Sequence, residues 1–344
     1  MKTLTLRLLL QKISERFFIR IPRNGIDDNQ IDHRPILKTE LTTLNTILLH
    51  RGFGSKKKLF ICGHAFKKYP VRRHDRKRSK LRNIINNIRR FAPTIFKNTE
   101  ITVSVRSKIF TTQSDESGYF ELEIPIEHER EGWHSYSATF SGSDREFHGE
   151  YYIAKDNGVG VISDIDDSLL VSHSAYNLRK LYTLLVNNSH SRRAVSNIGE
   201  LERIWQLENR GNTPNFFVYL SNSEWNLYDF LIDFFDVNEL PRGVYLLNSI
   251  ITHFSEFFTK QGKKLHNNHK VKSIERLISY FPEKRWLLVG DTAQHDVNIF
   301  ESVIIAHPNA IQAIIVREIK EKHERKTADI KKLSNEKNIR FYTY

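Results

Sequence analysis

Two hydrophobic periodicities divide this chain into two regions. From Lys58 to Ile153, apolar and polar residues alternate with a period of two, which is the pattern of half-buried strands. After Gly158, short continuous apolar runs alternate with segments of helical spacing, which is the pattern of a parallel sheet covered by helices. The sequence therefore predicts an antiparallel β-sandwich followed by an α/β domain with a Rossmann-type parallel sheet.

The individual elements follow from these patterns and from the turn signals between them. In the first region the predicted strands are 59–65, 101–105, 119–124 and 136–140, with a basic helix around 81–88 inserted after the first. In the second region the predicted strands are 159–163, 216–220, 286–289 and 310–317. The predicted helices there are 176–186, 198–208, 225–235 and 271–278.

Four segments result from this division. Residues 1–40 are predicted to be an amphipathic helix and a polar linker, and docking of that helix on the protein's own core is favoured over a membrane interface. Residues 41–155 form the predicted sandwich, whose phrase from Asp115 to Phe120 resembles the turn into a strand of transthyretin-like sandwiches. Residues 156–320 form the α/β domain, and 321–344 form a charged C-terminal tail.

Chemically active residues follow three of the predicted parallel strands. The first strand runs into Asp164, Asp166 and Ser168, the second into Ser221 and Asn222, and the third into Asp291 with Asp296 close behind. Lys270 opens the predicted helix 271–278. An isolated Asp-x-Asp is as readily a pair of solvated acids capping a helix, but the ordered set predicts one site, because open α/β sheets bind ligands at the carboxyl ends of their strands.

Phosphoryl transfer explains why these residue types are needed. Asp164 is the predicted nucleophile, which becomes an aspartyl phosphate, and Asp166 is the predicted general acid and base. Ser221 and Lys270 are predicted to bind the transferring phosphate oxygens. The full predicted substrate-binding set is Ser168, Ser221, Asn222 and Lys270. The predicted cofactor is Mg²⁺, with Asp164, Asp166, Asp291 and Asp296 as its ligands.

Ordered in this way, the residues resemble the four motifs of the haloacid-dehalogenase (HAD-like) superfamily of phosphohydrolases. The phrases around Asp164, Ser221, Lys270 and Asp291 further resemble the catalytic domain of the actin-patch-type phosphatidate phosphatases, over roughly residues 155–320. Ser168 stands where that family usually has Thr, and both carry a hydroxyl. The resemblance implies a HAD-like fold and Mg²⁺-dependent removal of phosphate from phosphatidate, leaving diacylglycerol.

Charge and composition bear on partners and location. The net charge is +13, and a basic run between Lys67 and Arg90 contributes much of it. Such a run is a solvated face or a contact for an anionic membrane surface, and nucleic acid is disfavoured because aromatic residues are scarce there. One cysteine excludes a disulfide framework. Because no signal peptide or membrane-spanning apolar segment is recognised, the expected location is the cytoplasm. Peripheral association with a membrane surface is left open as a further expectation.

Other function classes compete with a lipid phosphatase. A phosphatase of a soluble phosphate ester would use the same residues, and a non-catalytic lipid- or partner-binding protein would not need the intact carboxylate set. A glycosyltransferase could use Asp-x-Asp but would not need Lys270 or Asp291. The histidines His266, His269 and His295 lack metal-ligand spacing, and Trp225 is predicted to be core rather than pocket lining.

Overall fold

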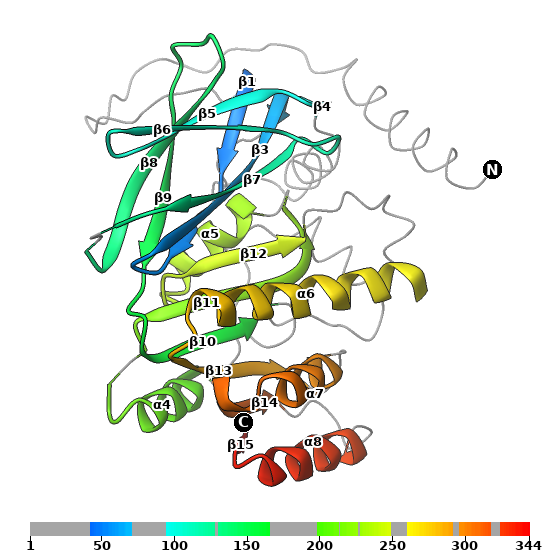
Figure 1. The fold of residues 1–344 in the computed structure, drawn as a ribbon. Coiled ribbons are helices and arrows are strands. Elements are labelled where there is room, and N and C mark those ends of the chain that lie inside the picture. The colour runs from blue at the N-terminus through cyan, green and yellow to red at the C-terminus, as the bar shows by residue number, and fades with distance from the viewer. Residues whose placement is uncertain are drawn as a thin grey trace, which may run out of the picture.

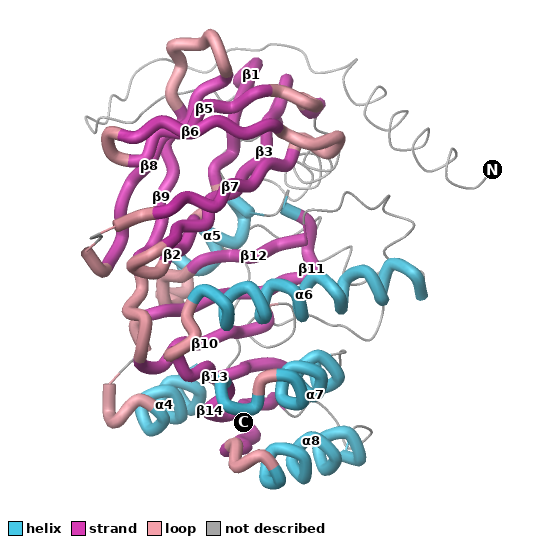
Figure 2. Tube along the Cα trace, in the orientation of Figure 1, coloured by secondary structure: helices cyan, strands magenta, loops and turns pink. Residues whose placement is uncertain are grey.

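A computed structural model describes most of the two predicted regions. The described residues are 42–70, 94–127, 130–165, 198–212, 214–225, 228–248, 260–291, 296–317 and 324–344. The predicted N-terminal helix, the basic insertion and the predicted helix 176–186 lie outside them. All helices of the described chain belong to the second region, and the first region consists of strands and loops (Figure 2).

Nine strands form one sheet in the first region. They are β1 (Thr42–Leu49), β2 (Gly52–Gly54), β3 (Lys58–Pro70), β4 (Thr94–Ile95), β5 (Glu100–Val105), β6 (Lys108–Gln113), β7 (Tyr119–Pro125), β8 (Gly132–Phe140) and β9 (Phe147–Ile153). The order is β1-β3-β2-β9-β8-β5-β6, with β4 and β7 also paired to β3. Among the described strands of this sheet, every pairing is antiparallel except that of β2 with β9.

The alternating pattern correctly predicted the antiparallel character of this region. In β5, Ile101, Val103 and Val105 are buried while the residues between them are not, so one face packs on the core as the period of two requires. Hydrogen bonds join all nine strands into one sheet. The two-layer, transthyretin-like sandwich arrangement stays a prediction.

The second region has a six-stranded parallel sheet. Its strands are β10 (Gly158–Asp164), β11 (Phe216–Glu224), β12 (Val244–Asn248), β13 (Lys284–Asp291), β14 (Ile311–Arg317) and β15 (Arg340–Thr343). Their order is β12-β11-β10-β13-β14-β15, and each neighbouring pair is parallel. The segment predicted as a charged tail supplies α8 and β15, and β15 extends the sheet beside β14.

Helices cover both faces of the parallel sheet. They are α4 (Ile198–Glu208), α5 (Tyr228–Val237), α6 (Lys260–Tyr280), α7 (Asp296–Ala306) and α8 (Glu324–Glu336), with a 3₁₀ turn, η4 (Pro308–Ala310), before β14. One apolar cluster joins α6, α7 and α8 to one face of the sheet, and a second joins α4 and α5 to the other (Figure 1). The parallel α/β class is confirmed, and the HAD-like assignment stays a prediction.

The two regions share a continuous apolar core. Phe53 and Phe60 of the first sheet belong to the same buried cluster as residues of β11 and α6. The ring of Phe53 lies 5.1 Å from that of Tyr280. Arg276 of α6 makes two ion-pair contacts of 3.2 Å with Glu121 of β7. Because the helix that carries Lys270 rests on the first sheet, the two regions pack as one unit.

Trp225 illustrates the same contact between the regions. It is buried, as predicted for a core residue, and its ring stacks on His64 of β3 at 4.2 Å.

Within the described residues, no helix is long and apolar enough to span a membrane.

Candidate active site

The carboxyl ends of three neighbouring strands form the candidate active site. β10 lies between β11 and β13, and its last residue, Asp164, pairs in register with Leu220 of β11. Ser221 is the next residue of β11, and β13 ends at Asp291. All three polar side chains are buried. The parallel sheet thus brings residues from three distant parts of the chain to one edge, as the sequence predicted.

Lys270 connects this edge to the helical layer. Its Nζ donates a hydrogen bond to Oδ1 of Asp164 at 2.5 Å and another to Oδ1 of Asp296 at 2.7 Å. The side chains of Lys270, Asp164 and Asp296 are at most 3% exposed. A buried ammonium needs such partners, because an isolated charge in the protein interior loses its hydration without compensation.

The position of Lys270 in its helix differs from the expectation. The pattern placed it at the start of a helix, whereas α6 begins ten residues earlier at Lys260. Residues 260–269, at the start of α6, contain a single large apolar residue, Leu265, so they lack the apolar periodicity by which a helix is recognised. Lys270 therefore projects from the middle of a long helix, which fixes its backbone more firmly than a helix end would.

Gly290 explains how α7 brings Asp296 to the site. A Cβ atom on Gly290 would lie 2.8 Å from two ring carbons of Phe300 and 3.1 Å from Cβ of Asp296. Only glycine therefore allows α7 to pack this closely against the end of β13. Asp296 is the first residue of α7, where the helix dipole favours a carboxylate.

The residues at this edge provide a partial test for a divalent cation. Asp164, Asp291 and Asp296 contribute three carboxylates beside the single ammonium of Lys270. Oδ2 of Asp296 is buried without a hydrogen-bond partner among the described residues, and carboxylate oxygens suit Mg²⁺. No group of three or more potential ligands with metal-binding geometry occurs within the described ranges, and the predicted ligand Asp166 lies outside them. The Mg²⁺ site therefore stays a prediction.

Several predicted site residues are not placed. Asp166, Ser168 and His295 lie outside the described residues. Asn222 lies in β11, where the pairing with β12 shifts register between Ser221 and Glu224. The structure does not describe its side chain. The structure thus brings Asp164, Lys270, Ser221, Asp291 and Asp296 to one edge of the sheet, and their roles stay predictions.

Two buried histidines behind the end of β11 were missed by the sequence analysis. His50 stacks on Tyr228 at 4.5 Å, and His64 stacks on Trp225. Burial lowers the pKa of His50 to about 3, and burial together with the neighbouring His50 holds the pKa of His64 well below its usual range. Both rings are therefore neutral parts of the contact between the regions. No motif marks them, since His50 directly after β1 and His64 within β3 form no recognisable spacing.

The fold and the site define a class of protein: a parallel α/β domain with a buried carboxylate–lysine cluster at the carboxyl edge of its sheet. Residues 159–318 match the family model described as "Phosphatidate phosphatase APP1, catalytic domain". This segment is therefore similar to that catalytic-domain family, which confirms the resemblance recognised in the motifs.

Individual relatives agree over the same part of the chain. The chain is 25% identical over 160 residues to phosphatidate phosphatase APP1 of Saccharomyces cerevisiae, covering 46% of this chain and 26% of that protein. It is 22% identical over 218 residues to an uncharacterized protein of Schizosaccharomyces pombe, covering 61% of this chain and 34% of the other. The chain thus spans between a quarter and about a third of the length of these relatives.

Among solved structures, a carbohydrate acetylesterase from Xanthomonas citri aligns over 78% of this chain and 68% of its own, with 11% identity and a TM-score of 0.28. A second structure, of a carbohydrate esterase whose active site has catalytic and non-catalytic binding functions, aligns over 79% of this chain and 88% of its own. Its identity is 8% and its TM-score 0.20. At these values neither structure contributes to the argument.

Proposed function

We propose that this chain is a Mg²⁺-dependent, HAD-like phosphatase that removes the phosphate from phosphatidate or a related lipid phosphomonoester. The observation that carries the proposal is the buried contact of Lys270 with Asp164 and Asp296, within a segment that matches the phosphatidate phosphatase catalytic-domain family. Positive charge beside a carboxylate suits phosphoryl transfer, because attack on a phosphate ester brings two anions together.

Asp164 is the proposed nucleophile. The hydrogen bond from Lys270 to Oδ1 holds the plane of the carboxylate, so that an oxygen of Asp164 can be presented to phosphorus. As the bond between this oxygen and phosphorus forms, the bond from phosphorus to the lipid alcohol oxygen breaks. Asp166 gives its proton to that alcohol oxygen, so diacylglycerol leaves and Asp164 carries the phosphoryl group.

Hydrolysis of the aspartyl phosphate completes the reaction. Water attacks the phosphorus while Asp166, now a carboxylate, takes a proton from that water. The bond between Asp164 and phosphorus breaks, which restores the carboxylate and releases inorganic phosphate. During both steps Lys270 and Ser221, with Ser168 and Asn222, are proposed to bind the phosphoryl oxygens.

The proposed Mg²⁺ ligands are Asp164, Asp166, Asp291 and Asp296. When bound, the ion would neutralise negative charge on the phosphate oxygens. The burial of Asp291 and of Asp296 supports this assignment, because carboxylates are kept in a protein interior only where cations or hydrogen bonds compensate them.

A lipid substrate implies contact with a membrane surface. The net charge of +13 supports peripheral association with anionic lipid, since each Lys or Arg near such a surface adds about 1 kcal/mol of attraction. The proposed location is therefore the cytoplasm, at a membrane surface. If the substrate were instead a soluble phosphate ester, the rate of phosphate release would not depend on the presence of vesicles.

Phosphate release from a panel of substrates tests the proposal. Phosphatidate in vesicles, glycerol 3-phosphate, a sugar phosphate and a phosphopeptide are compared with and without Mg²⁺. We expect phosphatidate to be turned over fastest, only with Mg²⁺, and Asp291→Asn to need more Mg²⁺ than the parent. Equal turnover without the metal, or a preference for a soluble ester, would contradict the proposal.

A further inference from the structure

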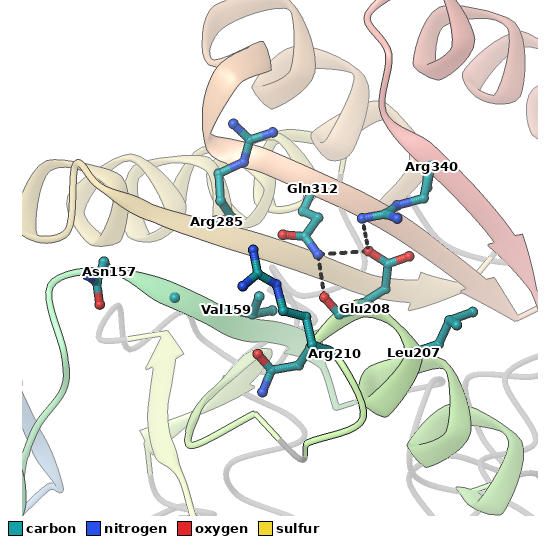
Figure 3. A pocket seen from close by; sticks show the side chains of 10 residues that line it. Asn157, Val159, Leu207, Glu208, Arg210, Arg285, Gln312 and Arg340 are labelled. Carbon is teal, nitrogen blue, oxygen red and sulfur yellow. Dashed lines mark hydrogen bonds and ion pairs between the residues drawn. The ribbon is translucent and has the colours of Figure 1, made fainter.

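A hollow lies at the edge of the parallel sheet opposite the candidate active site, where the strands begin. It has a volume of about 640 Å³ and is lined by the turn after α4 and by the first residues of β10, β13, β14 and β15 (Figure 3). Its lining includes Arg210, Arg285 and Arg340. Because the candidate active site lies at the carboxyl edge of the same sheet, the hollow is a separate place on the molecule.

The wall of this hollow around Glu208 is built from specific contacts. The side chain of Glu208 is fully buried and forms an ion pair of 2.8 Å with Nη2 of Arg340. Gln312 Nε2 donates to Oε2 of Glu208 at 2.8 Å, and the Tyr342 hydroxyl donates to Oε1 at 2.5 Å. The carboxylate is therefore already compensated by its neighbours and leaves little negative charge to repel an anion.

Two further arginines at the hollow carry positive charge that no acidic side chain of the described residues neutralises. Arg210 and Arg285 are exposed and form no ion pair with any of the described residues. They come from different elements, the turn after α4 and the second residue of β13. In Figure 3 the side chain of Arg210 extends towards the strands that carry Arg285 and Gln312. Two guanidinium groups with no acid of their own at one hollow favour a ligand with at least two negative charges.

The size and the apolar part of the hollow restrict the ligand further. A volume of about 640 Å³ is in the range of pockets for small organic molecules and exceeds what one phosphate needs. Leu207, which is 61% exposed, and Val159 add an apolar side. A ligand with phosphate groups for the arginines and an organic part for the apolar side matches both features.

We propose that this hollow binds a small organic phosphate through Arg210 and Arg285. The same chemistry could come from a free metabolite or from a lipid headgroup. The free form fits better if the proposed function holds, because a bilayer that presents a lipid to the carboxyl edge of the sheet does not reach the opposite edge.

Binding of a non-hydrolysable nucleotide analogue to the full chain tests this. Calorimetry with α,β-methylene-ADP compares the parent, the double variant Arg210→Gln/Arg285→Gln, and the control Arg130→Gln/Arg203→Gln, which removes two exposed arginines elsewhere. We expect Kd to rise at least about tenfold in the hollow variant and to change less than about threefold in the control. Circular dichroism melting verifies that both variants are folded.

Two further arms separate the sites and the ligand sources. Ser221→Ala, verified as folded by circular dichroism melting, should bind the analogue as the parent does. Loss of binding in this folded variant with retention in the hollow variant would assign the ligand to the active site and overturn the proposal. No binding by the parent would also overturn it. Sedimentation with vesicles of phosphatidylcholine and phosphatidate should be equal in the hollow variant and the control. A selective loss in the hollow variant would show that the ligand is a lipid headgroup and contradict the free form.

Discussion

Replacing Lys270 by methionine should destabilise the protein strongly. Methionine keeps most of the volume of the lysine stem, so the packing cost is small, but it removes the ammonium that contacts both Asp164 and Asp296. Removing one partner of a buried ion pair typically costs about 3–5 kcal/mol, because the remaining charge stays buried without its counterion. We expect the free energy of unfolding of Lys270→Met to fall by about that amount.

Urea denaturation followed by circular dichroism measures this loss. One buried apolar cluster contains residues of both regions, so we expect a single transition from which the free energy can be extrapolated. Lys272→Met is the matched control, because Lys272 is exposed on the same helix and its replacement should cost less than about 0.5 kcal/mol.

A second substitution identifies the source of the loss. If buried Asp296 is destabilising once Lys270 is gone, then adding Asp296→Asn to Lys270→Met should recover part of the lost free energy. A loss below about 1 kcal/mol in Lys270→Met, or no recovery in the double variant, would refute the reasoning that Lys270 compensates buried carboxylates.

Two further predictions concern the packing around the site and its pH dependence. Gly290→Ala should lower stability by about 1–3 kcal/mol and reduce phosphate release, because its methyl group would displace α7 and Asp296, as urea denaturation and a turnover assay would show. Below pH 6.5 the unfolded chain protonates His50 while the folded chain, with the pKa near 3, does not, so stability should fall as pH falls from 6.5 towards 3. The slope contributed by this one histidine is at most about 1.4 kcal/mol per pH unit, and His50→Phe should remove it.

Each of these predictions has a result that contradicts it. Unchanged stability and turnover in Gly290→Ala would mean that α7 does not need its close approach to β13. An equally steep pH dependence in His50→Phe and the parent would mean that this ring is not the group that protonates on unfolding.

The site could be read from the sequence because three of its strands are nearly continuous apolar runs that stop at polar residues. Val161 and Ile162 of β10 and Leu287 and Leu288 of β13 are fully or almost fully buried, and such runs are the strongest signal of a parallel sheet. Once the strands are parallel, their carboxyl ends must share an edge. The meeting of Asp164, Ser221 and Asp291 at one edge was therefore predictable, whereas the hydrogen bonds that Lys270 makes from α6 were not.

Elements with weak apolar patterns were not predictable. β15 (Arg340–Thr343) is short, and β6 (Lys108–Gln113) is largely exposed. Neither strand has a fully buried face, so neither sequence shows the apolar alternation by which a strand is recognised. The early turns of α6 were not predicted because their sequence carries no apolar stripe. The arginine hollow joins residues more than 50 positions apart along the chain, such as Arg210, Arg285 and Arg340, without any shared motif, so only the folded sheet brings them together.

Locating the covalent phosphoryl group shows directly whether Asp164 is the nucleophile. The full chain is mixed with phosphatidate vesicles and Mg²⁺ and quenched in acid, and hydride reduction then converts any aspartyl phosphate to homoserine for detection by peptide mass spectrometry. We expect homoserine at position 164 in the parent and at no position in Asp164→Asn, whose phosphate release should fall by on the order of a thousandfold or more. A phosphoryl group on another residue, or undiminished phosphate release by Asp164→Asn, would contradict it.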